Sequence, residues 1–84
     1  MSRGAEGGTA VAKRSLSVAG HRTSISLEDA FWTGLRDIAA ARGLPVAGLV
    51  AEIDRGRGDA NLSSAIRVYV LGVYRDGAGF PPPD

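Results

Sequence analysis

The chain has 84 residues, no cysteine and a formal net charge of +1 at pH 7. A chain this short predicts one small domain, and the lack of cysteine excludes disulfides, cysteine-ligated zinc and thiol catalysis. The sequence holds neither an apolar run long enough to cross a membrane nor a cleavable signal, so we expect a cytoplasmic protein with no membrane partner.

The two ends of the chain lack the periodic patterns of secondary structure. Residues 1–12 are expected to form a disordered arm, because the first ten hold three glycines and no repeating apolar position. Residues 76–84 are expected to form a disordered tail, because two glycines and the run Pro81-Pro82-Pro83 do not pack as a helix. One folded domain is therefore predicted over residues 13–75.

Charge is distributed unevenly along the chain. Residues 1–27 hold four basic side chains against one acidic, whereas residues 28–84 hold six basic against eight acidic. The N-terminal part is therefore positive and the rest is mildly acidic, which is the polarity expected if the N-terminal part faces phosphates.

Residues 22–27 alternate between polar and apolar side chains, which predicts a β-strand. One face carries Arg22, Ser24 and Ser26, and the other carries Thr23, Ile25 and Leu27. A strand cannot pair its own backbone groups, so it needs a partner. A second copy of the chain would supply one, and a two-stranded ribbon with arginine and serine on one face suits the DNA major groove.

Residues 13–18 alternate in the same way and are joined to the first strand by Ala19-Gly20-His21. They predict either a hairpin within one chain, which gives a four-stranded sheet in a dimer, or a basic arm that orders only on DNA. If this segment is the one that contacts the bases, Lys13, Ser15 and Ser17 take the place of Arg22, Ser24 and Ser26.

Three helices are predicted after the strand. The first spans about 28–42 and is stopped by Gly43 and Pro45. The second begins near Pro45 and ends in the Arg-Gly-Arg-Gly run at 55–58. Their apolar stripes include Phe31, Leu35, Ile38, Leu49, Val50 and Ile53.

The third helix, about 62–75, is apolar on most of its faces and must be enclosed by neighbours. Two other short helices do not suffice in a monomer, so we assign it to a dimer core. Ser63 is positioned to cap this helix, and the free amides there offer a grip for a phosphate. Ser26, with Asp29 three residues later, fits a capping box for the first helix as an alternative to contacting a base.

These segments resemble the ribbon-helix-helix family of Arc- and Met-type repressors. The resemblance rests on Arg22-Thr-Ser-Ile-Ser-Leu27, a helix of about four turns, Gly43-Leu44 and a further helix. A subfamily of short bacterial ribbon-helix-helix proteins is similar at Lys13-Arg14-Ser-Leu-Ser-Val, Gly20-His21-Arg22, Ser-Leu-Glu-Asp-Ala-Phe-Trp (26–32) and Asn61-Leu-Ser-Ser-Ala-Ile-Arg67. Together these segments cover residues 13–75.

The resemblance implies a mainly α fold with short β-strands, forming an intertwined homodimer with an intermolecular antiparallel ribbon and about three helices per chain. It makes Arg22, Ser24 and Ser26 the candidates for base contacts. Contacts with the DNA backbone, or from an arm, are expected from Lys13, Arg14, Ser15, Ser17, His21, Ser63 and Ser64. The dimer core is expected to contain Ile25, Leu27, Ile66, Tyr69, Val70 and Val73.

The family usually has two helices after the strand, whereas this sequence predicts three. Either the helix at 45–57 or the helix at 62–75 is therefore the central dimer helix, and we favour 62–75. In the other assignment, Pro45 removes an amide from the turn expected to hold a phosphate.

We expect the protein to be a sequence-specific DNA-binding transcriptional regulator. It would bind DNA as a homodimer and act as a repressor. The alternative is an antitoxin-like module that binds and neutralises a partner protein, although only nine residues follow Arg75. We expect no enzyme activity, catalytic residue, metal or cofactor, because His21 is the sole histidine and has no second ligand or catalytic partner.

Overall fold

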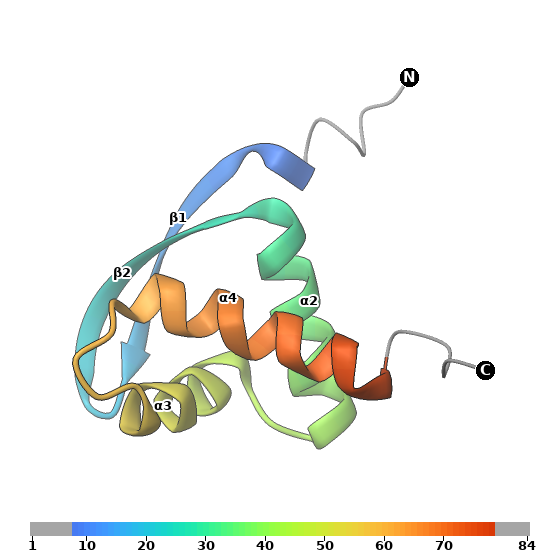
Figure 1. The fold of residues 1–84 in the computed structure, drawn as a ribbon. Helices are drawn as coiled ribbons and strands as arrows, with labels where there is room; N and C mark the ends of the chain where they lie inside the picture. The colour runs from blue at the N-terminus through green and yellow to red at the C-terminus, as the bar shows by residue number, and fades with distance from the viewer. Residues whose placement is uncertain (1–7, 79–84) are drawn as a thin grey trace.

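A computed structural model describes residues 8–78, which form a two-stranded antiparallel sheet followed by three helices (Figure 1). The strands are β1 (Val11–Val18) and β2 (His21–Glu28). The helices are α2 (Asp29–Arg42), α3 (Val46–Gly56) and α4 (Leu62–Val73), and α4 continues into a π-helical turn, η1 (Tyr74–Ala78). The expected class, mainly α with short strands and three helices, is confirmed.

Strands β1 and β2 form a hairpin within one chain. Their pairing runs from Val11 opposite Glu28 to Val18 opposite His21. The two turn residues, Ala19 and Gly20, have positive φ angles of 52° and 86°, as a type I′ turn requires. The hairpin alternative is therefore confirmed. Strand β1 occupies one edge of β2, and the other edge has no strand partner within residues 8–78.

The inner face of the hairpin packs on the helices. Ile25 and Leu27 of β2 are buried, as their alternation predicted. Trp32 of α2 is also buried, and its Nε1 donates a hydrogen bond of 2.9 Å to the carbonyl oxygen of Ala12 in β1. This bond joins segments 20 residues apart in sequence. Trp32 therefore belongs to the core and anchors the hairpin to the first helix.

Helix α2 ends where the sequence predicted. Gly43 adopts the left-handed conformation (φ 70°), and its N–H donates to the Ala40 carbonyl at 3.1 Å. At the other end the N-cap residue is Glu28, and no side chain caps the helix. The capping alternative for Ser26 is therefore wrong, because Ser26 lies within β2, two residues before that position.

The turn between α3 and α4 is held by Arg57. Its Nε donates to Asp54 Oδ1 and its Nη1 donates to the Ala60 carbonyl, each at 2.5 Å. Asn61 then caps α4, because its Oδ1 accepts a hydrogen bond of 3.2 Å from the Ser64 amide. The prediction of Ser63 as the cap is wrong, since Asn61 already fills the N-cap position next to Leu62.

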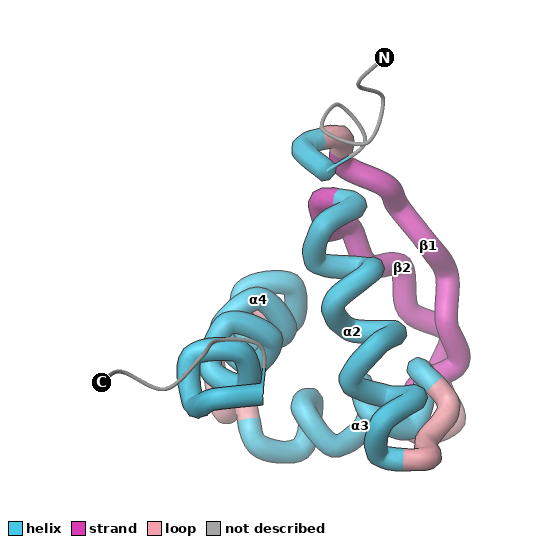
Figure 2. The backbone as a smooth tube through the Cα atoms, turned by 90° about the vertical axis from the view of Figure 1, so that its right-hand side faces the viewer, coloured by secondary structure: helices cyan, strands magenta, loops and turns pink. Residues whose placement is uncertain are grey.

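Helix α2 lies between the sheet and α4, and β1 is on the far side of β2 from α4 (Figure 2). Helix α4 packs on α2, α3 and β2, whereas α3 packs on β1. Gly34 permits the close approach of α2 and α4, because a Cβ there would lie 2.9 Å from Val70 Cγ1. One chain thus encloses the face of α4 that carries Ile66 and Val70 but leaves Val68 and Leu71 exposed, which agrees with the expectation that a single chain cannot enclose the whole helix.

The described residues contain the whole of the predicted domain, 13–75. Strand β1 begins two residues earlier, at Val11, and residues 76–78 belong to η1. The disorder expected for residues 1–7 and 79–84 lies outside the described residues. No helix between residues 8 and 78 has both the length and the hydropathy needed to cross a membrane.

Candidate nucleic-acid interface

The outward surface of the hairpin carries the polar side chains of both strands. Lys13 lies opposite Ser26, Ser15 opposite Ser24, and Ser17 opposite Arg22. Residues directly opposite each other in an antiparallel pair point to the same side of the sheet. The polar residues of β1 and those of β2, which the sequence presented as alternative candidates for contacting bases, therefore form one surface. We call this surface the outer face.

The outer face is accessible. Its exposed residues are Lys13, Ser15, Ser17, Arg22 and Ser24, and Ser26 is half-buried. Neither the Lys13 nor the Arg22 side chain has a hydrogen bond or ion pair within residues 8–78. Two cations and four hydroxyls thus share a surface with unused hydrogen-bonding capacity, which is the chemistry needed to contact phosphates and base edges.

Arg14 and His21 do not belong to the outer face. Arg14 lies opposite the buried Ile25, and its guanidinium carbon is 5.3 Å from the centroid of the Trp32 ring. This cation–π contact holds Arg14 against α2. His21 is exposed at the turn end of the hairpin, opposite the buried Val18. Both residues therefore lie on the inner face of the sheet, opposite to the face that carries Lys13 and Arg22.

The start of α4 is the second region where the sequence predicted backbone contacts. Ser63 is half-buried and Ser64 is exposed. The Ser64 amide already donates to Asn61, so the amides before it are the ones left for a ligand. This segment is therefore a weaker anion site than the sequence alone predicted.

An ion pair connects the start of α4 to the end of β2. Arg67 Nε donates to Glu28 Oε1 at 3.1 Å, with both side chains about one-third exposed (37% and 34%). The backbone amide of Glu28 and then the Arg67 guanidinium hold the pKa of Glu28 below its ordinary value of 4.5. Sequence reasoning missed this pair, because 39 positions separate the two residues and no local pattern links them.

Most of the predicted dimer-core residues are buried within a single chain. Ile25, Leu27, Ile66 and Val70 are at most 4% exposed. Tyr69 and Val73 are half-buried, and Tyr69 accepts a hydrogen bond of 3.2 Å from Arg42. These side chains form the core of the chain itself, so any dimer contact has to use other residues or these last two.

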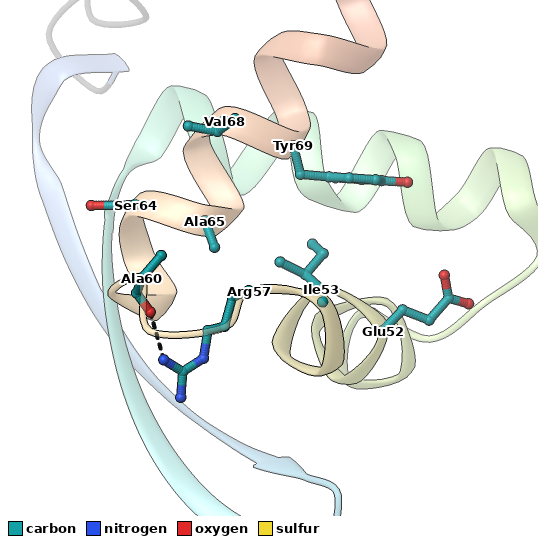
Figure 3. Close-up of a pocket in the computed structure, with 9 residues that line it drawn as sticks. Glu52, Ile53, Arg57, Ala60, Ser64, Ala65, Val68 and Tyr69 are labelled. Atoms are coloured by element: carbon teal, nitrogen blue, oxygen red, sulfur yellow. Dashed lines mark hydrogen bonds between the residues drawn. The ribbon is translucent and has the colours of Figure 1, made fainter.

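A groove of about 470 Å³ lies between α3 and α4 (Figure 3). Its lining is mainly apolar and includes Ile53, Ala65, Val68 and Tyr69. In the part of the chain that the structure describes, no group of three or more His, Cys, Asp or Glu residues lies close enough to hold a metal ion.

Comparisons with known proteins agree with this arrangement. The family model described as ribbon-helix-helix domain matches residues 11–74, from the first residue of β1 to just beyond α4. A solved structure, that of an uncharacterized protein from Bordetella pertussis Tohama I, is similar with 33% sequence identity and a TM-score of 0.70. The similarity covers 90% of this chain but 66% of that one. No curated protein matches. Since the family model spans most of its length, the chain belongs to the ribbon-helix-helix domain family.

Proposed function

We propose that this chain is a homodimeric, sequence-specific DNA-binding transcriptional regulator that acts as a repressor. Proteins of this family typically bind DNA as dimers. The outer face is the observation that supports the assignment, because Lys13 and Arg22 share it with four serine hydroxyls and have no partner within residues 8–78. Occupying an operator through this surface would block transcription without any catalysis.

The unpaired edge of β2 supports pairing between two copies. If two β2 strands pair antiparallel, the dimer has a four-stranded sheet with β2 strands in the centre and β1 strands outside. Neighbouring strands lie about 4.8 Å apart, so the outer axes are about 14 Å apart. A major groove about 12 Å wide admits two strands but not four. The β2 strands therefore face the bases, and the β1 strands lie over the phosphate backbones.

This division assigns a role to each polar residue of the outer face. Arg22 takes a guanine edge through two parallel hydrogen bonds, while Ser24 and Ser26 contact neighbouring bases. The β1 set, Lys13, Ser15 and Ser17, contacts phosphates, which hold the protein in register but carry no sequence information. The first amides of α4 and the hydroxyls of Ser63 and Ser64 add contacts with the DNA phosphates beside the major groove.

Selection of bound sequences from random DNA, followed by titration of the selected site, tests the proposal. We expect Arg22→Ala to lower affinity for that site by about 5- to 150-fold, since one good base contact is worth about 1–3 kcal/mol. Its weak binding to unrelated DNA should change little. Arg36→Ala removes an exposed arginine from α2 and is the matched control. Unchanged site affinity in Arg22→Ala, or the recovery of no preferred sequence, contradicts the proposal.

An antitoxin-like protein-interaction module is the competing function. It predicts a salt-insensitive complex with a co-purifying protein. Binding to DNA through Lys13 and Arg22 would instead weaken steeply with added salt, because counterions are released from the phosphates. The same titration at several salt concentrations therefore separates the two functions.

A further inference from the structure

A hollow of about 520 Å³ lies between β1 and α2. Arg14 lines it from the strand, whereas Asp29, Thr33 and Arg36 line it from the helix. Trp32 also borders it. Sites for small molecules commonly enclose about 300–1,000 Å³. The hollow is therefore large enough for a small molecule, and its lining carries more charge than the mainly apolar groove between α3 and α4.

The spacing of the α2 residues places their side chains along one stripe of the helix. Thr33 follows Asp29 by four positions, and Arg36 follows Trp32 by four positions. The guanidinium carbon of Arg14 is 5.3 Å from the centroid of the Trp32 ring, so a cation–π contact holds this side chain beside the stripe. The two arginines therefore reach one hollow from different elements.

A hydrogen bond sets the position of β1 along α2. The Asp29 amide donates to the Ala10 carbonyl at 2.8 Å, and both elements run downward from this point in Figure 2. From Ala10 to Arg14 a strand advances about 13 Å, and from Asp29 to Arg36 a helix advances about 10.5 Å. Arg14 and Arg36 consequently lie at nearly the same level.

The positive charge of the hollow is not neutralised within residues 8–78. Neither the Arg14 nor the Arg36 side chain has a hydrogen bond or ion pair there, and Asp29 pairs with neither of them. Arginine binds phosphate oxygens through parallel N–H donors, and a phosphate monoester carries a charge of about −1.5 to −2. A pair of guanidinium groups matches that charge, whereas a single carboxylate would leave one of them without a counter-ion.

We propose that this hollow binds a small phosphate monoester that carries hydroxyl groups, such as a sugar phosphate. Arg14 and Arg36 bind the phosphate, and the Thr33 hydroxyl donates to one of its oxygens. Asp29 lies about 10.5 Å from Arg36 along the helix, so its carboxylate keeps the phosphate at the other end and accepts hydrogen bonds from the hydroxyls. The site is on the inner face of the hairpin, and the inference does not depend on DNA binding.

Tryptophan fluorescence tests the site, since Trp32 is the only tryptophan in the chain and borders the hollow. Ribose 5-phosphate is the probe, titrated at constant ionic strength. We expect a saturable change in emission with a dissociation constant below about 1 mM, the upper end of common substrate affinities. Ribose should cause no change. Inorganic phosphate should bind about 2- to 10-fold more weakly, because it lacks the hydroxyls that Asp29 accepts.

Two arginine variants of equal net charge show whether the hollow is where the probe binds. Arg36→Ala should raise the dissociation constant at least about tenfold, because charge-assisted hydrogen bonds are lost. Arg55→Ala removes an exposed arginine from α3 and should leave the dissociation constant unchanged. Ribose 5-phosphate should also raise the thermal midpoint of the wild-type chain and of Arg55→Ala, but not that of Arg36→Ala.

Three results would overturn the proposal. The first is no saturable binding of ribose 5-phosphate, and the second is an equal loss of affinity in Arg36→Ala and Arg55→Ala. The third is a loss of affinity for the selected DNA site in Arg36→Ala, which would assign the hollow to DNA phosphates. Inorganic phosphate that binds as tightly as the probe contradicts the contact with Asp29. Because the titration contains no DNA, its failure is distinct from a failure to select a DNA sequence.

Discussion

At the scale of single residues, two long-range contacts orient the outer face. The Trp32 indole holds β1 through the Ala12 carbonyl, and Arg67 holds the end of β2 through Glu28. The Trp32 side chain is buried, whereas the Arg67–Glu28 pair is partly exposed. We therefore expect Trp32 to matter mainly for stability and the Arg67–Glu28 pair to matter mainly for the pH dependence of that stability.

Trp32→Phe tests the buried contact. It leaves an aromatic ring in the core but removes the donor to Ala12, so we expect the free energy of unfolding to fall by about 1–3 kcal/mol in denaturant titrations. Tyr69→Phe removes a hydrogen bond between exposed groups and should change it by less than about 0.5 kcal/mol. Equal effects of the two variants would contradict the role given to Trp32.

The Arg67–Glu28 pair predicts how stability responds to acid. Because the pKa of Glu28 is lowered in the folded chain, its stabilising contribution is present above pH 4.5 and is lost as the pH falls through the folded value. Glu28→Gln should therefore lower the thermal midpoint at pH 7 and have a smaller effect at acid pH, where the Glu28 carboxyl becomes protonated in the folded chain as well. Asp37→Asn, which replaces an exposed acid on α2, is the control. A Glu28→Gln effect that is the same at both pH values would be inconsistent with this contact.

At the scale of elements, the hairpin and the α2–α4 crossing determine what the molecule presents to a ligand. The register of the hairpin places the polar sets of β1 and β2 on one surface. The crossing at Gly34 sets how closely α4 approaches α2, and therefore where the start of α4 lies relative to that surface. Each of these arrangements has a substitution that tests it.

Two glycine substitutions test the helix crossing, because we expect only one of them to stabilise the fold. A Cβ at Gly34 would lie 2.9 Å from Val70 Cγ1, whereas one at Gly72 meets nothing within 4 Å. In Gly34→Ala the overpacking cost of about 1–3 kcal/mol exceeds or offsets the gain in helix propensity, so no net stabilisation is expected. Gly72→Ala should stabilise by about 0.5–1 kcal/mol. Thermal unfolding measures both, and equal stabilisation by the two variants would contradict the close crossing.

Lys13→Ala tests the role proposed for β1. If Lys13 contacts a phosphate, its loss weakens binding to specific and unrelated DNA alike, and the slope of log affinity against log salt falls by about 1. Arg22→Ala should instead change the sequence preference. A Lys13→Ala protein that prefers a different sequence would show that β1 reads bases, and our division between the strands would be wrong.

At the scale of the whole molecule, the proposed function depends on the association of two 84-residue chains. A single outer face spans one hairpin, whereas two copies joined along β2 present a symmetric surface to a two-fold symmetric operator.

Association predicts a concentration-dependent stability. Because the second copy binds only folded chains, the thermal midpoint should rise as the protein concentration is raised. Calorimetry over an about hundredfold range of protein concentration checks this. A wild-type midpoint that is independent of concentration would argue against a dimer that forms on folding.

The sequence by itself determined the features that depend on neighbouring residues. Alternation identified the strand at 22–27 and the second strand at 13–18, and Gly43 marked the end of the first helix. Helical spacing also identified residues that α2 and α3 bury, among them Leu35, Leu49 and Val50. These patterns are readable because strand alternation and helix stops arise from backbone geometry within a few residues.

Only the tertiary structure decided how those elements meet. It chose the hairpin over the free arm and thereby merged two rival sets of polar residues into one outer face. It also showed that Ile66 and Val70 are enclosed within one chain, which leaves Val68 and Leu71 as the exposed face of α4. The physical reason is that register and helix packing depend on contacts between distant segments, such as Trp32 with Ala12, that no local pattern encodes.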